Sequence, residues 1–517
     1  MYWTGAGPAP APPPPLWQCG QFAGQCDPSA IITLQRFLDL ANGRRATFPI
    51  HGGGQAWGVD GCNSGHRLHP QGCSKQSPCT GPTNSGICNP DNYQWWTYYW
   101  QEGRHPYYSA LPAGDGADLL PALYRVYAQT LPLHMARVRS WWNHSGAVFP
   151  ERFYLFGPID NPTYGCETPP ASPDKATGLF QKYHIVGTLA LCALGLDDFD
   201  YHSGGGVVDP AMKQRLAEFV IPICLNATTY YLAHYPQTGP GGKLDLFPAQ
   251  AEETWQCPAE PQVNRSNCVT NPASDIAGLW SVTTRMMQPA LAKMLTAAQV
   301  ASLRDLLLHI PPLPKGPRPY NPLPTSDEVY LPASRVPLVP VNSENIALHA
   351  VFPFRLTHVG EDDSLMNLTL ARATFAHRPF PCHANSFWCE DGNVAALLGL
   401  TNEAAYDVLA ACMVPTDPGW RFPLWHGGGG DTVPTMMPQS ILRQTLHSMV
   451  LQHNRAGELL LFPAWPVHWD VSFKLHAPMG TVVEARCVNG SVSHLVVTPT
   501  ARLKDVRLLG CKADDTI

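Results

Sequence analysis

Apolar residues recur at three- and four-residue intervals through most of the chain, and this spacing predicts amphipathic helices. In the first predicted helix, residues 30–42, Ile31, Leu34 and Leu38 fall on one face. The same spacing predicts helices over residues 118–142, with a kink or break at Pro132, and over residues 176–194, 211–234, 275–295, 297–310, 345–354, 364–376, 393–398, 403–413 and 440–454. The 53 prolines and 43 glycines are concentrated between these segments, so we expect long, ordered loops on a mainly α-helical scaffold.

The pattern changes after Gly457. The stretches ELLLFPAWP, WDVSFKLHAP, TVVEARC and SHLVVTP are short, rich in valine and partly alternating, which predicts β-strands. We therefore expect a proline-rich linker or fragment end over residues 1–29, a helical domain over 30–456 and a small β domain over 457–517. Residues 61–90 are polar and contain four cysteines, which predicts a disulfide-tied insertion in the helical domain.

Charged residues are few, at 14% of the 517 residues, and the net charge is −6. The chain has no block of Lys or Arg, so the sequence does not indicate nucleic-acid binding. It has no run of eighteen apolar residues, so we expect no membrane span. The 15 tryptophans offer flat apolar faces with one N–H each, which suit sugar rings as well as protein cores.

The 16 cysteines are even in number and clustered, without the Cys-x-x-Cys pairs of a metal site. This favours disulfides and an oxidising compartment. Most of the cysteines should be paired, and Cys257–Cys268 and Cys382–Cys389 are the bridges we expect first, because loops this short close easily.

Five N-x-S/T sequons agree with a secretory location, and their glycans should lie on the outer surface. They are Asn143, Asn226, Asn264, Asn367 and Asn489. Residues 1–18 lack the basic and apolar regions of a signal peptide, so we expect that the chain begins inside a longer precursor.

The stretch LDLFPAQAEETW, residues 244–255, places the adjacent carboxylates Glu252 and Glu253 beside Phe247 and Trp255. Apolar surroundings disfavour the charged form of a carboxyl group and raise its pKa, so such a group can act as a general acid near neutral pH. The alternative is an irregular surface loop with two solvated glutamates. The aromatic stretch NYQWWTYYWQEGRHPYY, residues 92–108, fits either a sugar-binding wall or core packing.

Six stretches, in order, resemble the (α/α)6-barrel glycosidases related to glycoside hydrolase family 95, the inverting α-L-fucosidases, and most closely a little-characterised relative of that family. They are WWTYYWQEGRHPYYSAL, FPERFYLFG, LFPAQAEETW, NSENIALHAVFPFRL, FWCEDGNVAALLGL and LLLFPAWPVHWDVSFKLHAPMGTVVEARCVNGSV. The resemblance implies a toroid of twelve helices in two concentric rings, followed by a β-sandwich. The loops between helices would line its funnel. Such relatives carry a large β-sandwich before the barrel, for which this chain has no room.

The resemblance places the general acid on Glu253. We expect this side chain to be mostly buried at the bottom of the largest pocket, with aromatic rings nearby and a raised pKa. Inverting hydrolysis also needs a group that activates water, with the two carboxyl groups about 6.5–9.5 Å apart. Here the sequence departs from the family, because Gly53 in HGGGQAW stands where asparagine is expected and Met437 stands at the place of an aspartate. Asp431 is the nearest carboxylate that could replace it, and Asp391 is a second candidate. Both could equally be helix N-caps.

We therefore expect a secreted, inverting glycoside hydrolase whose carboxylates need no metal or organic cofactor. The carbohydrate substrate would be an α-L-fucoside or α-L-galactoside, on the resemblance alone. Residues of the loops and of the aromatic stretch would shape the sugar site, although some of the tryptophans should be core residues: His51, Trp95, Trp96, Arg104, Gln250, Trp255, Asn345, Arg355 and Trp388. The alternative is a non-catalytic glycan-binding or structural glycoprotein that keeps the barrel, which the departures at Gly53 and Met437 favour.

Overall fold

The computed structural model describes residues 2–6, 28–44, 100–150, 183–204, 207–258, 262–318, 325–337, 339–361, 365–382, 389–413 and 437–513. Helices make up most of this part before residue 451. They are α1 (Pro28–Gly43), α2 (Trp100–Ala113), α3 (Gly116–Trp142), α5 (Gly187–His202), α6 (Pro210–Arg215), the π-helix Leu216–Val220, α7 (Ile221–His234), α8 (Ala273–Met286), α9 (Pro289–Ala292), α10 (Ala297–His309), α11 (Leu368–Ala376), α12 (Asp391–Leu397), α13 (Thr401–Met413) and α14 (Met437–Val450).

Most of these helices follow the apolar spacing, and the exceptions have local causes. Helix α3 continues through Pro121 and Pro132, so the break predicted at Pro132 is wrong. Helix α2 was not predicted, because Gly103, Pro106 and Pro112 make its sequence a poor helix former. The helix predicted over residues 345–354 is also wrong: only the 3-10 turn Ile346–Leu348 forms there, and turns follow it.

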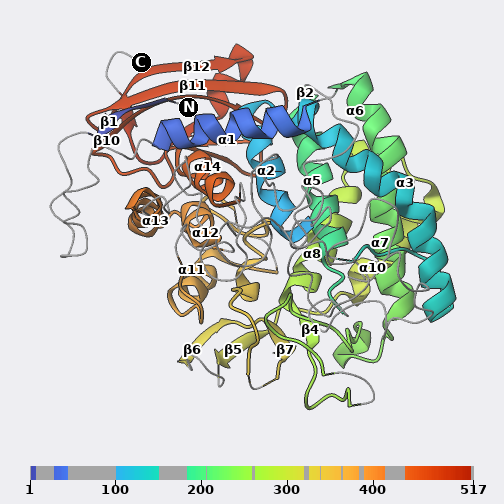
Figure 1. Ribbon diagram of the computed structural model, residues 1–517. Helices are drawn as coiled ribbons and strands as arrows, with labels where there is room; N and C mark the ends of the chain where they lie inside the picture. The colour runs from blue at the N-terminus through green and yellow to red at the C-terminus, as the bar shows by residue number, and fades with distance from the viewer. Residues whose placement is uncertain are drawn as a thin grey trace, which may run out of the picture.

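The helices lie in an interior and an exterior layer. Twelve consecutive residues of α5, Thr188–Phe199, are buried, as is the whole of α12, which is the pattern of helices surrounded by protein. Helix α10, in contrast, buries only Leu303 and Leu306 and lies on the outside. Figure 1 shows α5 and α8 between α2 and the outer helices α3, α7 and α10. The interior helices therefore form the scaffold on which connecting loops are held.

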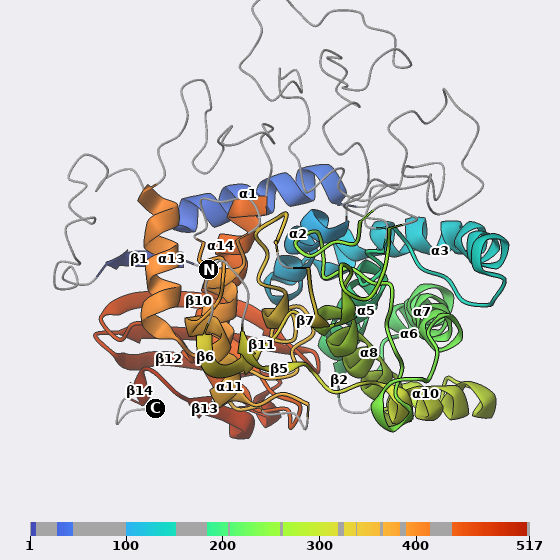
Figure 2. The same ribbon diagram turned by 90° about the horizontal axis from the view of Figure 1, so that it is seen from below.

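The C-terminal region forms a β domain, as the valine-rich alternation predicts. Its main sheet has the order β1-β10-β11-β12-β14, and the outer strands are β1 (Tyr2–Ala6) and β14 (Lys512–Ala513). Strands β10 (Trp469–Ala477), β11 (Thr481–Val488) and β12 (Ser491–Thr498) form an antiparallel meander. Buried and less buried residues alternate along β10, so one face of the sheet covers the core. Figure 2 shows this sheet beside α13 and α14, opposite the side that carries α3, α7 and α10.

The remaining strands are short. They are β2 (Ser203–Gly204), β3 (Val207–Val208), β4 (Thr270–Pro272), β5 (Lys315–Arg318), β6 (Thr325–Tyr330), β7 (Ala333–Arg335), β8 (Leu451–His453), β9 (Leu459–Leu461), β13 (Val506–Leu508) and β14 (Lys512–Ala513). Strand β8 begins before Gly457, so the β region starts a few residues earlier than predicted.

The N-terminal segment also differs from its prediction as a linker. Residues Tyr2–Ala6 form β1, which pairs antiparallel with β10 at the edge of the main sheet, and α1 begins at Pro28. A buried ion-pair network then fastens α1 to the rest of the fold: Arg443 of α14 contacts Asp39 at 3.0 Å and Asp115 at 3.2 Å. Both ends of the described chain are therefore tied to α14 or to the sheet.

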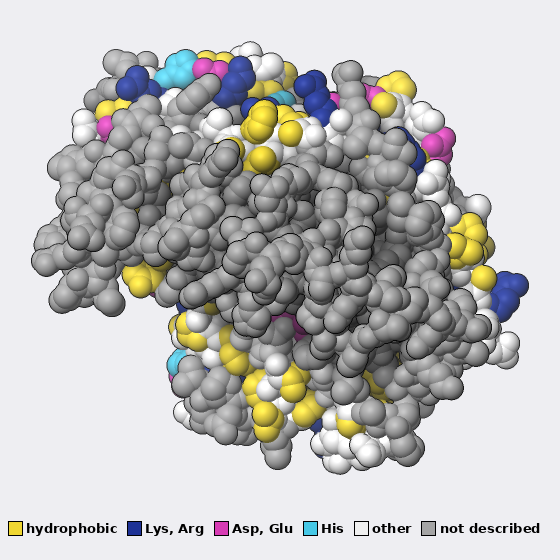
Figure 3. All heavy atoms as spheres, in the orientation of Figure 1, with side chains coloured by type: hydrophobic (Ala, Val, Ile, Leu, Met, Phe, Trp, Pro, Cys, Tyr) yellow, Lys and Arg dark blue, Asp and Glu magenta, His cyan; other side chains and the backbone are white. Residues whose placement is uncertain are grey.

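One helical run, Pro210–His234, is long and apolar enough to cross a membrane by composition, with a mean hydropathy of 1.3. Half of that window is buried in the fold, and α7 packs against α3, α5, α8 and α10. It therefore has the surroundings of a core helix. On the face in Figure 3, the visible Lys, Arg, Asp and Glu side chains of the described residues are scattered, without a block of one sign.

Candidate functional site

The carboxylate stretch forms a tight turn. Ala251 and Trp255 exchange backbone hydrogen bonds of 3.1 and 3.2 Å, and Glu252 between them adopts a left-handed conformation with φ 49°. A non-glycine residue in this region is uncommon and depends on its surroundings. The turn separates the two neighbouring glutamates: the Glu252 side chain is buried, whereas Glu253 is half-buried.

Glu252 lies between two histidines. His184 Nε2 is 2.6 Å from its Oε2, and His349 Nδ1 is 3.0 Å from its Oε1. Burial disfavours the Glu252 carboxylate, but His184 and His349 outweigh this and hold its pKa well below the ordinary value. Glu252 is therefore a permanent carboxylate with both oxygens engaged, and it is not available as a proton donor near neutral pH.

A second carboxylate, Glu390, faces His349 from the other side of the ring. Its Oε1 accepts hydrogen bonds from Arg104, at 3.0 Å from Nε and also from Nη2, and lies 3.2 Å from His105 Nε2. Its Oε2 lies 4.0 Å from His349 Nε2. Burial opposes ionisation here too, but its charged surroundings, Arg104 above all, lower the pKa of Glu390. His349 thus bridges two ionised carboxylates, one on each side of its ring.

Burial sets the charge of the histidine beside Glu390. His105 is buried, and this lowers its pKa to about 4 despite the nearby carboxylate. The imidazole is therefore neutral near pH 7, and its Nδ1 lies 3.4 Å from Gln444 Oε1. The formal charge that faces Glu390 then comes from Arg104. We call the group Arg104, His105, His184, Glu252, His349 and Glu390 the carboxylate–histidine cluster.

Five separate parts of the chain supply this cluster. Helix α2 provides Arg104 and His105, the segment before α5 provides His184, and the turn provides Glu252. The loop around η4 (Ile346–Leu348) provides His349, and Glu390 immediately precedes α12. The turn and the η4 loop are joined by Glu344, whose Oε2 accepts from Glu253 N at 3.1 Å and Thr254 Oγ1 at 2.9 Å. Segments that are far apart in the sequence therefore meet at one place, and they include the aromatic stretch and the carboxylate stretch.

Glu253 differs from its predicted environment. We expected it to be mostly buried, but its side chain is half-buried, and its Oε2 accepts a hydrogen bond of 3.1 Å from Asn342 Nδ2. The cause is the turn, which gives the interior position to Glu252. Glu253 consequently keeps access to solvent that its neighbour lacks.

Asp391 is neither a helix N-cap nor a free base. It is the first residue of α12, whose N-cap position is taken by Glu390. Its carboxylate accepts from Arg378 Nε, from the backbone N of Cys382 at 3.0 Å and from Asn345 Nδ2 at 3.2 Å. Burial raises the pKa of Asp391, and Arg378 opposes this. These contacts make Asp391 an anchor between the η4 loop and the start of α12.

The other residues predicted to bind sugar lie in different places, and some belong to the core. Trp255 is 1% exposed and packs against Val269, Ala333 and Ile346, so it is a core residue and the prediction of a sugar platform is wrong. Gln250 is buried and its Oε1 accepts from the backbone N of Tyr183 at 2.6 Å. Arg104 belongs to the cluster and Asn345 adjoins it, whereas Arg355 lines a separate cavity. His51, Trp95, Trp96, Trp388 and Asp431 lie outside the described residues.

Both predicted local disulfides are confirmed: Cys257 bonds to Cys268, and Cys382 to Cys389. Two further bridges join Cys192 to Cys224 and Cys487 to Cys511. The sulfurs of Cys382 and Cys389 lie within 4.8 Å of an Asp391 oxygen, but as a disulfide they offer no thiolate to a metal. Cys389 directly precedes Glu390, so this bridge fixes the chain at the cluster.

Four of the five sequon asparagines are exposed, as expected for glycosylation sites: Asn143, Asn264, Asn367 and Asn489. Asn226 is half-buried inside α7, and its Nδ2 donates to the carbonyl of Pro222 at 2.9 Å. A glycan on Asn226 would have to break this bond. Glycosylation itself stays a prediction at all five positions.

The sequence did not identify Glu390, His105, His184 or His349 as site residues. A signal was present, since His105 and His349 lie inside stretches that resemble the glycosidases and Glu390 adjoins Asp391 in CEDG. Periodicity cannot decide which of two adjacent carboxylates points inward at a turn or helix start. For both pairs, Glu252/Glu253 and Glu390/Asp391, the unselected neighbour joins the cluster.

Comparisons with known proteins leave the family open. No protein-family model matches the chain, and no curated protein does. Among solved structures, the chain is similar to one assigned as a kojibiose phosphorylase from the human microbiome, with a TM-score of 0.48 and 10% sequence identity. The match covers 75% of this chain and 52% of the other, so the chain spans about half of that protein's length. A similarity this low carries no argument about function.

Proposed function

We propose that the chain is a glycoside hydrolase that acts at the carboxylate–histidine cluster. The observation that carries the proposal is the pair of ionised carboxylates, Glu252 and Glu390, held on either side of His349 in the interior of a chain with few charges. Burying charge is costly unless it is paired, and perturbed carboxylates concentrate at functional sites. Apart from His184, the cluster residues lie in stretches that resemble the six-hairpin glycosidases, and we propose that the two helical layers close into their (α/α)6 toroid.

The available oxygen of Glu390 suits it to activate water. Arg104 and His105 occupy Oε1, whereas the described contact of Oε2 is His349 Nε2 at 4.0 Å. An ionised carboxylate with one oxygen left for a water molecule is what a general base requires. We therefore assign the base to Glu390, and we assign Arg104 and Asp391 to its positioning. This replaces the earlier assignment of the base to Asp391 or Asp431.

Glu253 remains the general acid in this proposal. A catalytic acid must reach the glycosidic oxygen and carry a proton, and Glu252 fails on both counts because it is buried and permanently ionised. Glu253 is the half-buried neighbour, and the neutral amide of Asn342 contacts it.

The substrate class comes from the resemblance: an α-L-fucoside or α-L-galactoside, cleaved with inversion. The four disulfides fit an extracellular location, where such bonds persist. The alternative is a non-catalytic glycan-binding protein, in which the same cluster serves stability alone.

The test compares Glu253→Gln and Glu390→Gln with the parent protein on a natural disaccharide and on an aryl glycoside with a good leaving group. Glu253→Gln should lose about 10²–10⁴-fold on the disaccharide and less on the aryl glycoside, which needs little protonation. Glu390→Gln should lose comparable activity on both. Glu484→Gln is the matched control and should leave both rates unchanged, because its side chain is 44% exposed on the outer face of β11.

The outcomes distinguish the hydrolase from the glycan-binding protein. Hydrolysis at the parent rate by Glu253→Gln or by Glu390→Gln would remove that residue from the mechanism. A folded parent protein that binds glycans but hydrolyses none across a broad panel would favour the binding protein.

A further inference from the structure

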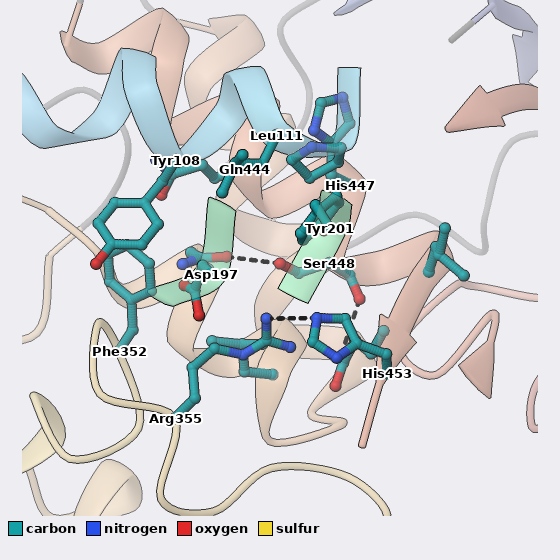
Figure 4. A pocket seen from close by; sticks show the side chains of 15 residues that line it. Tyr108, Leu111, Asp197, Tyr201, Phe352, Arg355, Gln444, His447, Ser448 and His453 are labelled. Atoms are coloured by element: carbon teal, nitrogen blue, oxygen red, sulfur yellow. Dashed lines mark hydrogen bonds between the residues drawn. The ribbon is translucent and has the colours of Figure 1, made fainter. Parts of the chain in front are cut away.

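A cavity of about 70 Å³ lies among the helix ends, and none of the six residues of the carboxylate–histidine cluster lines it. It is formed where four helices end: α2, α5, α12 and α14 each contribute residues from their last turns, and β8 closes it. Phe352 and Gln444 stand between the two places, since both line the cavity and both contact His105 of the cluster. Figure 4 shows side chains from these elements pointing toward one another around the cavity.

The charges around the cavity oppose each other. Among its described lining residues, Arg355 is the one cation and Asp197 the one carboxylate. Asp197 pairs with Arg285 at 2.8 Å, and the same guanidinium reaches Asp200 at 2.7 Å. The ends of the four helices add partial negative charge. A small anion is therefore disfavoured by Asp197 and the helix ends, and a cation by Arg355.

Arg355 is only partly satisfied. Its Nη1 donates to His453 Nε2 at 2.8 Å, and no carboxylate of the described chain lies within ion-pair distance of it. The residue adopts a left-handed conformation, with φ 50°, which is uncommon for a side chain of this size. Its remaining N–H groups are donors at the wall of the cavity. Figure 4 shows the Arg355–His453 bond at its edge.

Two buried polar atoms of the lining, one on His447 and one on Gln452, also have no hydrogen-bond partner among the described residues. His447 is 5% exposed, and its Nδ1 has no hydrogen-bond partner among the described residues. Gln452 is 2% exposed, and its Oε1 is likewise without a partner in the described part of the chain. A buried polar atom without a partner costs about 1–3 kcal/mol, so such atoms normally have an occupant to bond.

The chemistry of the lining indicates what that occupant is. Hydroxyl groups both donate and accept, so they match a wall that carries N–H donors, an amide oxygen and an imidazole. Tyr108, Tyr201 and Phe352 add aromatic surface that suits the C–H faces of a polyol. A cavity needs about 10–15 Å³ of such space to hold one water molecule, so this one has room for several waters or for one molecule of a few heavy atoms.

The geometry points to a second binding site, for a small neutral polyhydroxylated molecule of a few carbon atoms, held by Arg355, His447 and Gln452 between the ends of α2, α5, α12 and α14. The site does not depend on the proposed hydrolase activity, because none of these residues belongs to the carboxylate–histidine cluster.

Saturation-transfer NMR with glycerol as the probe tests the site in the full chain. Glycerol should receive saturation from the parent protein, and its binding should weaken about tenfold or more in Arg355→Met, which removes charged donors, and in His447→Phe, which removes Nδ1 at similar size. Arg507→Met, at an exposed ion pair, and Glu390→Gln, at the other site, should bind like the parent. Circular dichroism verifies that each variant is folded, and His447→Phe carries the test if Arg355→Met is not.

Equal saturation transfer to glycerol with all variants, or none with the parent, would overturn the proposal. Loss in Glu390→Gln with retention in His447→Phe would also overturn it, because the polyol would then occupy the carboxylate–histidine cluster. Neither result would bear on hydrolysis, which is measured separately.

Discussion

Replacing Arg104 by methionine tests the electrostatics of the cluster most sharply. The side chains of Arg104 and Glu390 are 6% and 12% exposed, and two guanidinium nitrogens bond one carboxylate oxygen. Methionine fills similar volume but leaves Glu390 buried without its main cation. Removing one partner of a buried ion pair costs about 3–5 kcal/mol, because the remaining charge stays desolvated.

The cost should depend on pH with a defined sign. In the parent protein the pKa of Glu390 is below its ordinary value of 4.5, so Glu390 stabilises the fold above that pH and loses this contribution as the pH falls. In Arg104→Met, burial raises the pKa of Glu390, and the variant loses stability as the pH rises. The difference between the two proteins should therefore be large at pH 8 and should shrink toward pH 5.

Urea unfolding followed by circular dichroism measures this difference at the two pH values. The double variant Arg104→Met/Glu390→Gln should cost roughly 1–3 kcal/mol less than the sum of the single variants, because it removes both charges together. Arg507→Met, at an ion pair of 3.7 Å whose members are 56% and 42% exposed, should cost about 1 kcal/mol or less. Additive single costs, or a cost for Arg104→Met that is small and independent of pH, would refute the reasoning.

Three further predictions follow from the described contacts. Replacing Cys382 and Cys389 by serines should lower the free energy of unfolding by about 2.5 kcal/mol and also reduce hydrolysis, since Cys389 precedes Glu390. Replacing Cys487 and Cys511 in the β domain should lower it by about 3.5 kcal/mol and leave hydrolysis unchanged. Reduced hydrolysis in both folded variants would contradict this. Burial raises the pKa of Asp275 from 3.8 to about 7, so between these pH values the parent loses stability as pH rises, and Asp275→Asn should gain relative to it from pH 5 to pH 8; a melting-temperature difference that is constant with pH would contradict this. Mass spectrometry of protein made in a secretory host should find Asn226 the least glycosylated of the five sequons, because its amide is bonded inside α7, and full occupancy there would count against this.

Much of the fold could be predicted, because helix and strand periods are local properties of sequence. Apolar spacing identified α1, α10 and α13 closely, and alternation identified the C-terminal strands. Helix α2 escaped because its glycine and prolines oppose helix formation, and packing between α3, α5 and α14 compensates. Strand β1 escaped because its partner, β10, lies more than 400 residues further along the chain.

The site could be predicted in outline only. The sequence indicated the turn and the start of α12, but at both positions the residue that enters the cluster is the neighbour of the one selected. The choice at the turn depends on the left-handed backbone of Glu252, and a carboxylate pair cannot encode this by itself. Likewise, His184 and His349 meet Glu252 only through tertiary packing, so the two adjacent glutamates differ: Glu252 is an ionised, buried carboxylate and Glu253 is half-buried.

The central claim is that Glu253 and Glu390 together cleave a glycosidic bond. The most direct test follows the anomeric proton of the freshly released sugar by NMR, with the parent protein and with Glu390→Gln on the same α-L-fucosides and α-L-galactosides. The account predicts release of the sugar with inverted configuration by the parent and loss of release by the folded variant. Retained configuration, or undiminished release by Glu390→Gln, would contradict it.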